Sequence, residues 1–500
     1  MQPTTDPSLT NGLSAATNMV LPALEEFTKF KDQDLAASQY SQWLAALNEP
    51  LPQAGAGAEE TLRILKEVII PAGGRIGAPG FSGWVTTMPT VIPAVAAFTA
   101  SIAGAQRWWH QPYNFLEILA LDWLKQLLGF PTSYQGTFSS GGSIANLIGL
   151  GAARQYACEQ KGIDAGRDGI GAIVKPRLYS SDQVHHVSIR AAAVLGLGRQ
   201  SIVQLPTDDA FRLDVDSLRA QLKRDMSDGC TPIAVIASAG TVNMGAVDPI
   251  GEILQVCREL KIWLHVDGAY GGFGLLDPEA APLFEGIQEA DSIAVDPHKW
   301  LAVPLGCGAT FVRDQKFLRG AFTLDPAEYL QGAARQVESI GSQFDGFGYL
   351  FDEFNMDFNM EQSARSRGAT VWAALKEMGA TGMRARVRTH NGFARHLAAR
   401  VQASAVLELL APVSLSICCF RYVPAELRGR KDALETLNGL NREVVSRMHH
   451  AHRYVPSSTQ INGAFAIRPC YINPRTTLAE VDGLADEVER LGAEIWKQRA

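Results

Sequence analysis

Short apolar runs alternate with helical stretches along the middle of the chain, from about residue 86 to residue 375. Each run is rich in β-branched and other apolar residues and is too short to be a helix. The predicted strands are Ala172–Val174, Ile202–Leu205, Ile233–Ala237, Ile262–Val266, Ile293–Val295 and Ala309–Val312. Strands joined through helices run parallel, and the helices pack on the faces of the sheet. The sequence therefore predicts an α/β fold with a mainly parallel central sheet and helices on both faces.

The regions before and after this alternation have a different pattern. Residues 21–47 and 58–69 carry apolar residues at helical spacing, and residues 415–421 and 463–468 are predicted strands among helices. The predicted division is an N-terminal helical segment (1–85), a large domain (86–375) and a smaller α+β C-terminal domain (376–500). Because the N-terminal helices have no partner surface of their own, we expect them to clasp another subunit.

One predicted strand ends abruptly at a lysine, in the sequence Asp296-Pro297-His298-Lys299. Burial disfavours the charged form of a lysine amine and lowers its pKa, which suits Schiff-base chemistry with an aldehyde cofactor. Taken alone, Lys299 would be a surface residue in the turn after a strand. Two features upstream favour the chemical interpretation.

A carboxylate closes another predicted strand. Asp267 is followed at once by Gly268 and Ala269, which leave room for a flat ring to lie against the backbone. A carboxylate in this position can pair with a protonated pyridine nitrogen and keep the ring an electron sink. Taken alone, Asp267 would be interpreted as a cap of the turn that follows it.

A glycine-rich turn precedes a helix predicted from Ile144 to about Gln160. Gly142 and Ser143 open this helix, so exposed backbone N–H groups, the helix dipole and a hydroxyl come together as a phosphate cradle. Taken alone, the turn would be an ordinary helix N-cap. A phosphate cradle, a ring-nitrogen partner and a lysine, in this order, together predict pyridoxal 5′-phosphate (PLP) as the cofactor.

These motifs resemble those of the group II pyridoxal-dependent amino acid decarboxylases, the family of the aromatic L-amino acid, glutamate and histidine decarboxylases. The resemblance runs from about Pro71 to the C-terminus. It rests on the segments 139–143, 179–185, 265–270, 296–300, 320–326, 466–468 and 473–477. It implies PLP fold type I, the fold of aspartate aminotransferase, and an active site at the interface of a homodimer.

The resemblance also implies roles for individual residues. Lys299 would carry PLP as a Schiff base, Asp267 would hold the ring nitrogen, and His185 would lie on the outer face of the ring. The remaining expected cofactor contacts are Gly142, Ser143, Thr241, Ala269 and His298. Val242 replaces a threonine that is common in the family, so one polar contact next to Thr241 is missing. Tyr329 resembles the mobile-loop tyrosine that protonates Cα, with a one-residue uncertainty in register, and a structural tyrosine at a helix start is the alternative.

The substrate pocket is predicted from a group of aromatic residues. Phe81 and Trp84, together with aromatic residues between 108 and 115, fall in the region that forms the side-chain pocket in relatives. Flat apolar walls favour an aromatic amino acid substrate. Most of these residues could instead belong to the core. Arg75 and Arg107 fall in the same region and would suit the distal carboxylate of an acidic substrate.

The predicted function is decarboxylation of an L-amino acid, aromatic by preference, to the amine and CO₂ through a quinonoid intermediate. One alternative on the same scaffold is decarboxylation with oxidative deamination to an aldehyde, and another is decarboxylation of an acidic amino acid. A nucleotide-binding oxidoreductase is supported only by Gly196-Leu197-Gly198, which is incomplete and follows a helix. A PLP-fold protein without catalysis is disfavoured by the intact Lys299, Asp267 and His185.

Composition limits the other possibilities. A net charge of −7 argues against a nucleic-acid partner. The seven cysteines are scattered, with neither metal-ligand spacing nor a disulfide framework, so we expect no metal, reduced thiols and a cytoplasmic location. The polar residues 1–12 do not form a secretory signal. The apolar stretch from Val91 to Ala105 is too short to cross a bilayer, so we expect no membrane association and a buried helix there.

Overall fold

The computed structural model describes residues 12–30, 43–105, 111–322, 358–361 and 363–499. A seven-stranded sheet forms the centre of the molecule, with strand order β2-β8-β7-β6-β5-β3-β4. Its strands are β2 (Gln135–Ser139), β3 (Pro176–Ser181), β4 (Ile202–Leu205), β5 (Thr231–Ser238), β6 (Trp263–Asp267), β7 (Ser292–Val295) and β8 (Gly308–Val312). Only β8 runs antiparallel to its neighbours among these strands. The predicted α/β architecture with a mainly parallel sheet is confirmed.

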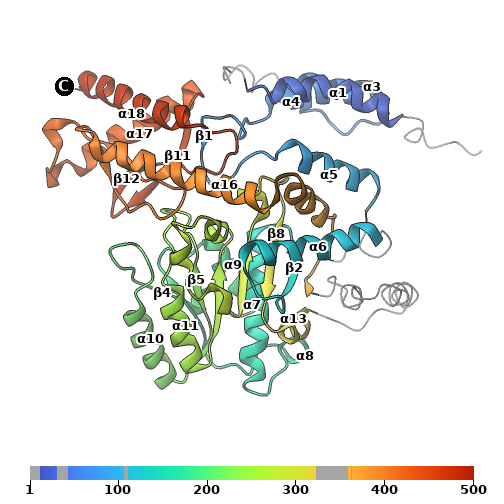
Figure 1. The fold of residues 1–500 in the computed structure, drawn as a ribbon, viewed down its shortest axis with the longest axis vertical. Coiled ribbons are helices and arrows are strands. Elements are labelled where there is room, and N and C mark those ends of the chain that lie inside the picture. Colours follow the sequence, from blue (N-terminus) through green and yellow to red (C-terminus); the bar gives the residue numbers. More distant parts are fainter. Residues whose placement is uncertain (1–11, 31–42, 106–110, 323–357, 362, 500) are drawn as a thin grey trace, which may run out of the picture.

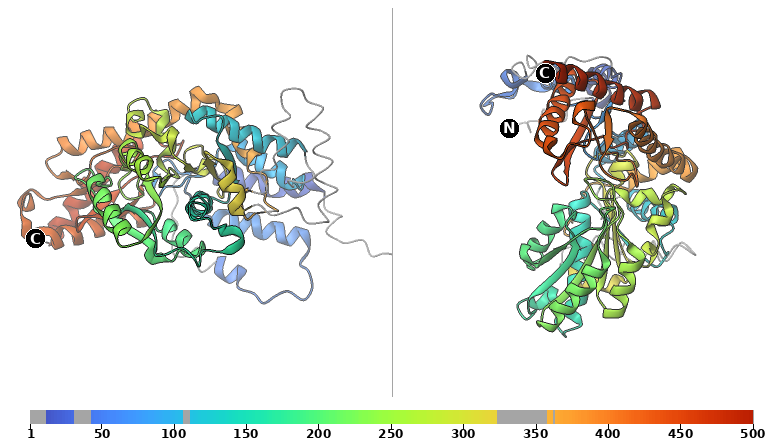
Figure 2. Two further views of the ribbon diagram at one scale, coloured as in Figure 1. Left: turned by 90° about the horizontal axis from the view of Figure 1, so that it is seen from below. Right: turned by 90° about the vertical axis from the view of Figure 1, so that its left-hand side faces the viewer.

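Helices cover both faces of this sheet (Figures 1 and 2). On β5, Ile236 packs in the apolar core beneath α7, while Val235 and Ala237 belong to the core on the opposite face. The alternation of side chains along a strand sends successive residues to opposite faces, and both faces of this strand are apolar. The helices of this part are α5 (Val91–Ile102), α6 (Gln111–Leu128), α7 (Gly142–Glu159), α8 (Ala165–Asp168), α9 (His186–Val194), α10 (Val215–Ser227), α11 (Ile250–Leu260), α12 (Pro297–Trp300) and α13 (Gln315–Phe322).

A second, five-stranded sheet lies in the C-terminal part, coloured orange and red in Figure 1. Its order is β1-β11-β12-β10-β9, and β1 (Phe81–Ser82) comes from a distant part of the chain to pair with β11. Its other elements are β9 (Leu407–Leu409), β10 (Phe420–Tyr422), β11 (Val455–Ile461), β12 (Ala464–Arg468), α16 (Gly368–Ala403), α17 (Leu434–Ala451) and α18 (Leu478–Arg499). Since α16 runs across residue 375 and β1 precedes residue 85, the three-part division (1–85, 86–375, 376–500) stays a prediction.

The N-terminal helices extend along one side of the molecule, at the upper right of Figure 1. They are α1 (Leu13–Phe27), α3 (Gly57–Ile64) and α4 (Ile70–Ala72), with a π-helical turn at Leu65–Ile69. None of the residues in these three helices and this turn is buried. Helices with this much apolar surface exposed gain stability mainly by packing against another surface.

Three local predictions are wrong. The strand predicted at residues 415–421 is largely absent, because β10 covers only Phe420–Tyr422. The segment Ala172–Val174 forms no strand; β3 begins at Pro176 and ends in Ser180 and Ser181, which are fully buried although their side chains are polar. The helix at α5 is present but is not buried, because Val91 is 67% and Ile102 56% exposed in the single chain. Apolar composition predicted burial, but in the single chain only Pro93 and Ala100 of this helix are buried. Among the described residues, no helix has the length and apolar character of a membrane span.

Candidate active site

A cavity of about 480 Å³ opens at the carboxyl edge of the central sheet. Its walls come from the turn before α7, from the loop after β3 and from the segments that follow β5, β6 and β7. Ligand sites in α/β sheets form at this edge because the loops after parallel strands converge there. The lining includes Trp84, Gly142, Ser143, His185, Thr241, Asp267, Ala269, Asp296, His298 and Lys299.

The lysine stands at the end of β7 in the one-turn helix α12. Pro297 opens this turn, so Lys299 and Asp296 come onto one side, and Lys299 Nζ lies 3.0 Å from Asp296 Oδ2. Asp296 is buried, and its Oδ1 has no hydrogen-bond partner among the described residues. His298 Nδ1 lies 2.7 Å from the carbonyl oxygen of Cys307. The result is a lysine amine held by a carboxylate inside the cavity.

Asp267, the residue expected to pair with a ring nitrogen, lies on β6, the strand next to β7. Asp267 ends β6, and its Oδ1 accepts a hydrogen bond of 3.1 Å from the backbone N–H of Ala269. This bond fixes the carboxylate at the turn and leaves its second oxygen for a ligand. The Ala269 side chain is buried beside Gly142, since a Cβ at Gly142 would lie 3.1 Å from that of Ala269.

The glycine turn before α7 leaves helix N–H groups without partners. Gly141, with φ 126°, has a backbone conformation that favours glycine and places the chain at the start of the helix. The first N–H groups of a helix have no intrahelical acceptor, and here those of Gly142 and Ser143 lie at the cavity. A Cβ at Gly142 would come 2.6 Å from Asp296 Oδ2, so the turn approaches the lysine side of the cavity closely. This cradle fits a phosphate group.

His185 forms another wall of the cavity. It caps α9, where its Nδ1 accepts a 3.3 Å hydrogen bond from the N–H of Val187, and its ring lies 4.3 Å from that of His186. Burial lowers the pKa of His185, and the nearby Asp267 carboxylate opposes that shift. A neutral imidazole at this wall can pack against a flat ring.

The remaining predicted residues are only partly brought together. Thr241 lines the cavity, while its hydroxyl accepts a 3.1 Å bond from the N–H of Ala246. Trp84 lines the cavity and is 66% exposed. Phe81 does not line it, because its backbone belongs to β1 and its ring packs 5.9 Å from that of Trp84. Tyr329 lies outside the described residues.

The sequence interpretation did not include Asp296 among the site residues. Its signal was present, because a carboxylate three residues before a lysine, with proline at the first helical position, places both side chains on the same turn. Asn146 and Gln183 also line the cavity and were not selected. Asn146 lies within a buried helix and Gln183 in a loop, and no sequence pattern around either residue indicates a site.

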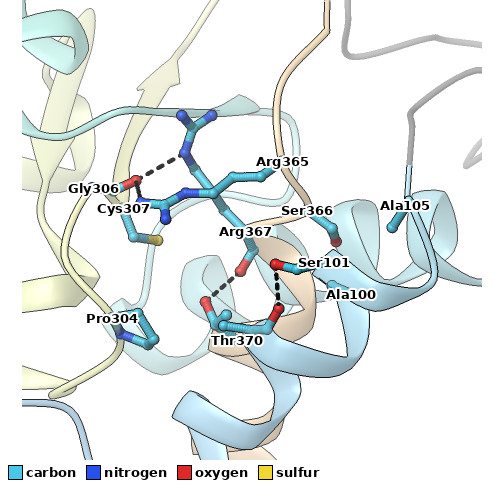
Figure 3. A pocket seen from close by; sticks show the side chains of 12 residues that line it. Ala100, Ser101, Ala105, Pro304, Gly306, Cys307, Arg365, Ser366, Arg367 and Thr370 are labelled. Atoms are coloured by element: carbon cyan, nitrogen blue, oxygen red, sulfur yellow. Dashed lines mark hydrogen bonds between the residues drawn. The ribbon is translucent and has the colours of Figure 1, made fainter. Parts of the chain in front are cut away.

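A smaller cavity of about 120 Å³ lies between α5 and the start of α16 (Figure 3). Arg367 Nε donates to the carbonyl of Gly306 at 2.9 Å, and Arg367 also pairs with Glu361 at 2.7 Å. Arg365 donates to the carbonyls of Leu305 and Gly306. Both arginines therefore hold the loop after Lys299 and do not line the larger cavity.

Comparison with known proteins identifies the family. Residues 90–423 match the pyridoxal-dependent decarboxylase conserved domain. The chain belongs to the pyridoxal-dependent decarboxylases. It is 32% identical over 459 residues to the aromatic-L-amino-acid decarboxylase of Bacillus atrophaeus, covering 90% of this chain and 88% of the relative. It is 28% identical to an acidic amino acid decarboxylase of Xenopus tropicalis, covering 72% and 68% of the two chains.

The fold agrees with this family. The crystal structure of Oryza sativa TDC with PLP and tryptamine matches with a TM-score of 0.86 at 24% identity, covering 99% of each chain. The cofactor of this pyridoxal-dependent decarboxylase is PLP, and the reaction class is that of a carboxy-lyase acting on an amino acid. The glycine turn before α7, Asp267 and Lys299 line one cavity, and their chemistry fits a phosphate, a ring nitrogen and an aldehyde.

Proposed function

We propose that the cavity holds PLP with its phosphate at the first turn of α7, its ring nitrogen at Asp267 and its aldehyde carbon at Lys299. The observation that carries this proposal is the convergence of all three groups on one cavity, with Lys299 Nζ held 3.0 Å from Asp296. Gly142, Ser143, Thr241, Ala269 and His298 supply the surrounding surface. Each of these residues belongs to a segment at the carboxyl edge of the sheet.

The residues of the chain then have separate tasks in decarboxylation. When bound, PLP supplies an electron sink for the electron pair that remains on Cα as CO₂ leaves. Asp267 keeps a proton on the ring nitrogen, since its carboxylate is fixed by the N–H of Ala269. His185 covers the ring and excludes water from that face. Asp296 accepts a hydrogen bond from the Lys299 amine whenever that amine is free.

We propose an aromatic L-amino acid as the substrate. Trp84 and Val242 give the cavity apolar surface, and Lys299 is the only lysine or arginine among the described residues that line it. A distal carboxylate would require a further cation, and Arg75 does not line the cavity but lies over the ring of Phe27. The similarity to an aromatic-L-amino-acid decarboxylase supports the same choice.

The test is a product assay on PLP-loaded protein. The natural L-amino acids are supplied one at a time, and CO₂, amine, aldehyde and O₂ uptake are measured together. Amine equal to CO₂ from an aromatic amino acid, without O₂ uptake, is the expected result. Preferential turnover of glutamate or aspartate would contradict the aromatic assignment. Aldehyde formation with O₂ uptake would instead establish the oxidative alternative.

We further propose that Tyr329 returns the proton to Cα. The support is the resemblance of its segment to the mobile loop of the family, whose tyrosine protonates Cα. The variant Tyr329→Phe is expected to release CO₂ while diverting product from amine to aldehyde. An unchanged amine-to-CO₂ ratio would remove Tyr329 from the mechanism. Tyr156→Phe is the control for loss of a tyrosine hydroxyl elsewhere, because the Tyr156 hydroxyl bonds to the carbonyl of Lys261 and does not line the cavity.

We propose that the protein acts as a homodimer. The support is an apolar row on α5, formed by Val91, Val95, Phe98 and Ile102, each at least 46% exposed in the single chain. Residues at this spacing share one helical face. The N-terminal helix α1 adds three exposed leucines, Leu13, Leu21 and Leu24. A second copy that covers this surface would remove it from water.

A further inference from the structure

Four polar side chains form one connected group in the layer between α7 and the central sheet. Asn146, His265 and Ser292 are fully buried, and Trp263 is 3% exposed. Burying polar groups costs free energy unless each finds a hydrogen-bond partner. Here every one of the four does, and the bonds form a continuous relay.

The directions of these hydrogen bonds are fixed by chemistry. The Trp263 indole can only donate, and its Nε1–H donates to Ser292 Oγ at 2.8 Å. The Asn146 amide nitrogen donates to the carbonyl of Gly142 at 2.8 Å, so Asn146 Oδ1, which can only accept, faces the imidazole. His265 Nε2 therefore carries the proton and donates to Asn146 Oδ1 at 2.8 Å. In the neutral ring Nδ1 then accepts from the Ser292 hydroxyl, at 2.7 Å.

This assignment leaves His265 as a neutral imidazole. Burial lowers the pKa of His265 to about 4, which agrees with the absence of a second proton on the ring. The helix approaches the imidazole closely, because a Cβ at Gly149 would lie 2.5 Å from His265 Cε1. Glycine at this position of α7 therefore leaves the space that the ring occupies.

The relay joins the three elements that carry the proposed cofactor groups. Asn146 lies on α7, four residues after Gly142, and His265 lies on β6, two residues before Asp267. Ser292 lies on β7, the strand that leads to Lys299, and is the register partner of His265. Side chains from all three elements, two of them from β6, thus take part in a single line of directed bonds.

We propose that His265 is a positioning residue for the cofactor, through a relay that fixes the phosphate turn of α7 relative to Asp267 and Lys299. The inference rests on the proposed placement of PLP. The pyridine ring of PLP fixes the spacing of its nitrogen and aldehyde, and its short phosphate arm limits how far the phosphate site can lie from them. Apolar contacts can slide with little change in energy, whereas hydrogen bonds of defined direction hold one register.

The test is a set of variants measured for PLP affinity. Apoprotein is titrated with PLP, and the dissociation constant is read from the absorbance of the lysine-bound cofactor. His265→Leu keeps bulk but leaves Ser292 Oγ and Asn146 Oδ1 without their partner, and we expect PLP to bind about tenfold more weakly. His265→Gln can offer one donor and one acceptor and is expected to recover part of the loss.

Ser292→Ala tests the relay without touching the cavity, and its smaller volume change protects folding. It is expected to weaken PLP binding less than His265→Leu does. The matched control is Asn441→Leu, because Asn441 is a fully buried amide that bonds to Tyr422 and Leu437 far from the cofactor. This control should lower the melting temperature of the apoprotein but leave the PLP dissociation constant unchanged.

The outcomes separate the two proposals. Native PLP affinity in both His265→Leu and Ser292→Ala, with a lowered melting temperature, would show a role in stability alone and would overturn the relay. Equal affinity of His265→Leu and His265→Gln would also contradict it. If the unmodified protein does not hold PLP at Lys299, as judged by borohydride reduction and peptide mapping, the proposed cofactor site fails before the relay is tested.

Discussion

At Gly142 the proposed phosphate cradle lies very close to the carboxylate of Asp296. A Cβ at this position would lie 2.6 Å from Asp296 Oδ2, a separation that side-chain carbons do not adopt without displacement. Asp296 is also the carboxylate that contacts Lys299. A single methyl group therefore disturbs two of the three proposed cofactor contacts.

We accordingly predict that Gly142→Ala weakens PLP binding by at least about tenfold, which corresponds to roughly 1.4 kcal/mol. The dissociation constant is measured by titration of the apoprotein. Gly392→Ala is the matched control, because Gly392 lies within α16 and a Cβ there would contact nothing within 4 Å. The control should stabilise the protein by about 0.5–1 kcal/mol and leave PLP binding unchanged. Native PLP affinity in Gly142→Ala would disprove the close approach.

At the scale of elements, the turn after Lys299 is tied to α16. Trp300 is fully buried, its ring stacks 5.3 Å from that of Tyr270, and its Nε1 donates to His390 Nδ1 at 3.0 Å. Tyr270 in turn bonds to Ser416 at 2.7 Å. The two aromatic residues follow Asp267 and Lys299 closely in sequence, so both proposed cofactor turns are connected to the C-terminal part.

Trp300→Phe is predicted to destabilise the protein by about 1–3 kcal/mol, because His390 Nδ1 loses its donor and a small cavity forms. Urea unfolding of the apoprotein measures the change. Trp496→Phe, at a partly buried indole with no hydrogen bond in the described part of the chain, should cost less. Equal losses in the two variants would show that the bond to His390 contributes nothing beyond packing.

At the scale of the whole molecule, three fully buried groups with large pKa shifts contribute to the response to acid. Burial lowers the pKa of His265 to about 4 and that of His390 to about 3, from an ordinary value of 6.5. Burial raises the pKa of Asp248 to about 6, from 3.8. Below pH 6.5 both histidines become protonated in the unfolded chain but stay neutral in the folded state. Acidification therefore disfavours folding through these two groups. Between pH 6 and 4 the folded state binds a proton at Asp248 that the unfolded chain does not, which favours it.

Of these three groups, His265 and His390 disfavour folding at low pH and Asp248 favours it. We therefore predict that the free energy of unfolding falls as pH is lowered from about 6 to about 4. The net slope of one proton corresponds to about 1.4 kcal/mol per pH unit. Urea unfolding of the apoprotein across this range measures it. His390→Gln removes one histidine and should flatten the dependence. A stability that rises on acidification would contradict the prediction.

The exposed apolar row on α5 bears on the proposed association of two whole molecules. Phe98→Asp is predicted to convert the dimer to monomer and to abolish decarboxylation, because it places a charge at the centre of the proposed interface. Sedimentation measures the mass. Val194→Asp is the control, since Val194 is 73% exposed on α9 and lies outside that row. A Phe98→Asp protein that stays dimeric would remove α5 from the interface.

The sequence by itself determined the architecture and the chemistry of this protein. Apolar runs bounded by turn residues predicted β4 at its observed bounds and predicted β5 to β8 to within two residues at either end. Asp267, Lys299 and the glycine turn were recognised because each stands at the end of an element, where a polar or flexible residue needs a local reason. Strand β2 was missed, because its sequence, Gln-Gly-Thr-Phe-Ser, has no apolar run.

Only the tertiary structure decided the relations between elements. Ser292, His265 and Asn146 are far apart in sequence, and nothing local indicates that they meet in a buried relay. Phe81 was expected in the substrate pocket, but its pairing with β11 turns it onto Trp84 instead. The apolar face of α5 could not be assigned to core or interface from its composition. Periodicity and turn chemistry are local properties, whereas burial and hydrogen-bond partners depend on which distant segments pack together.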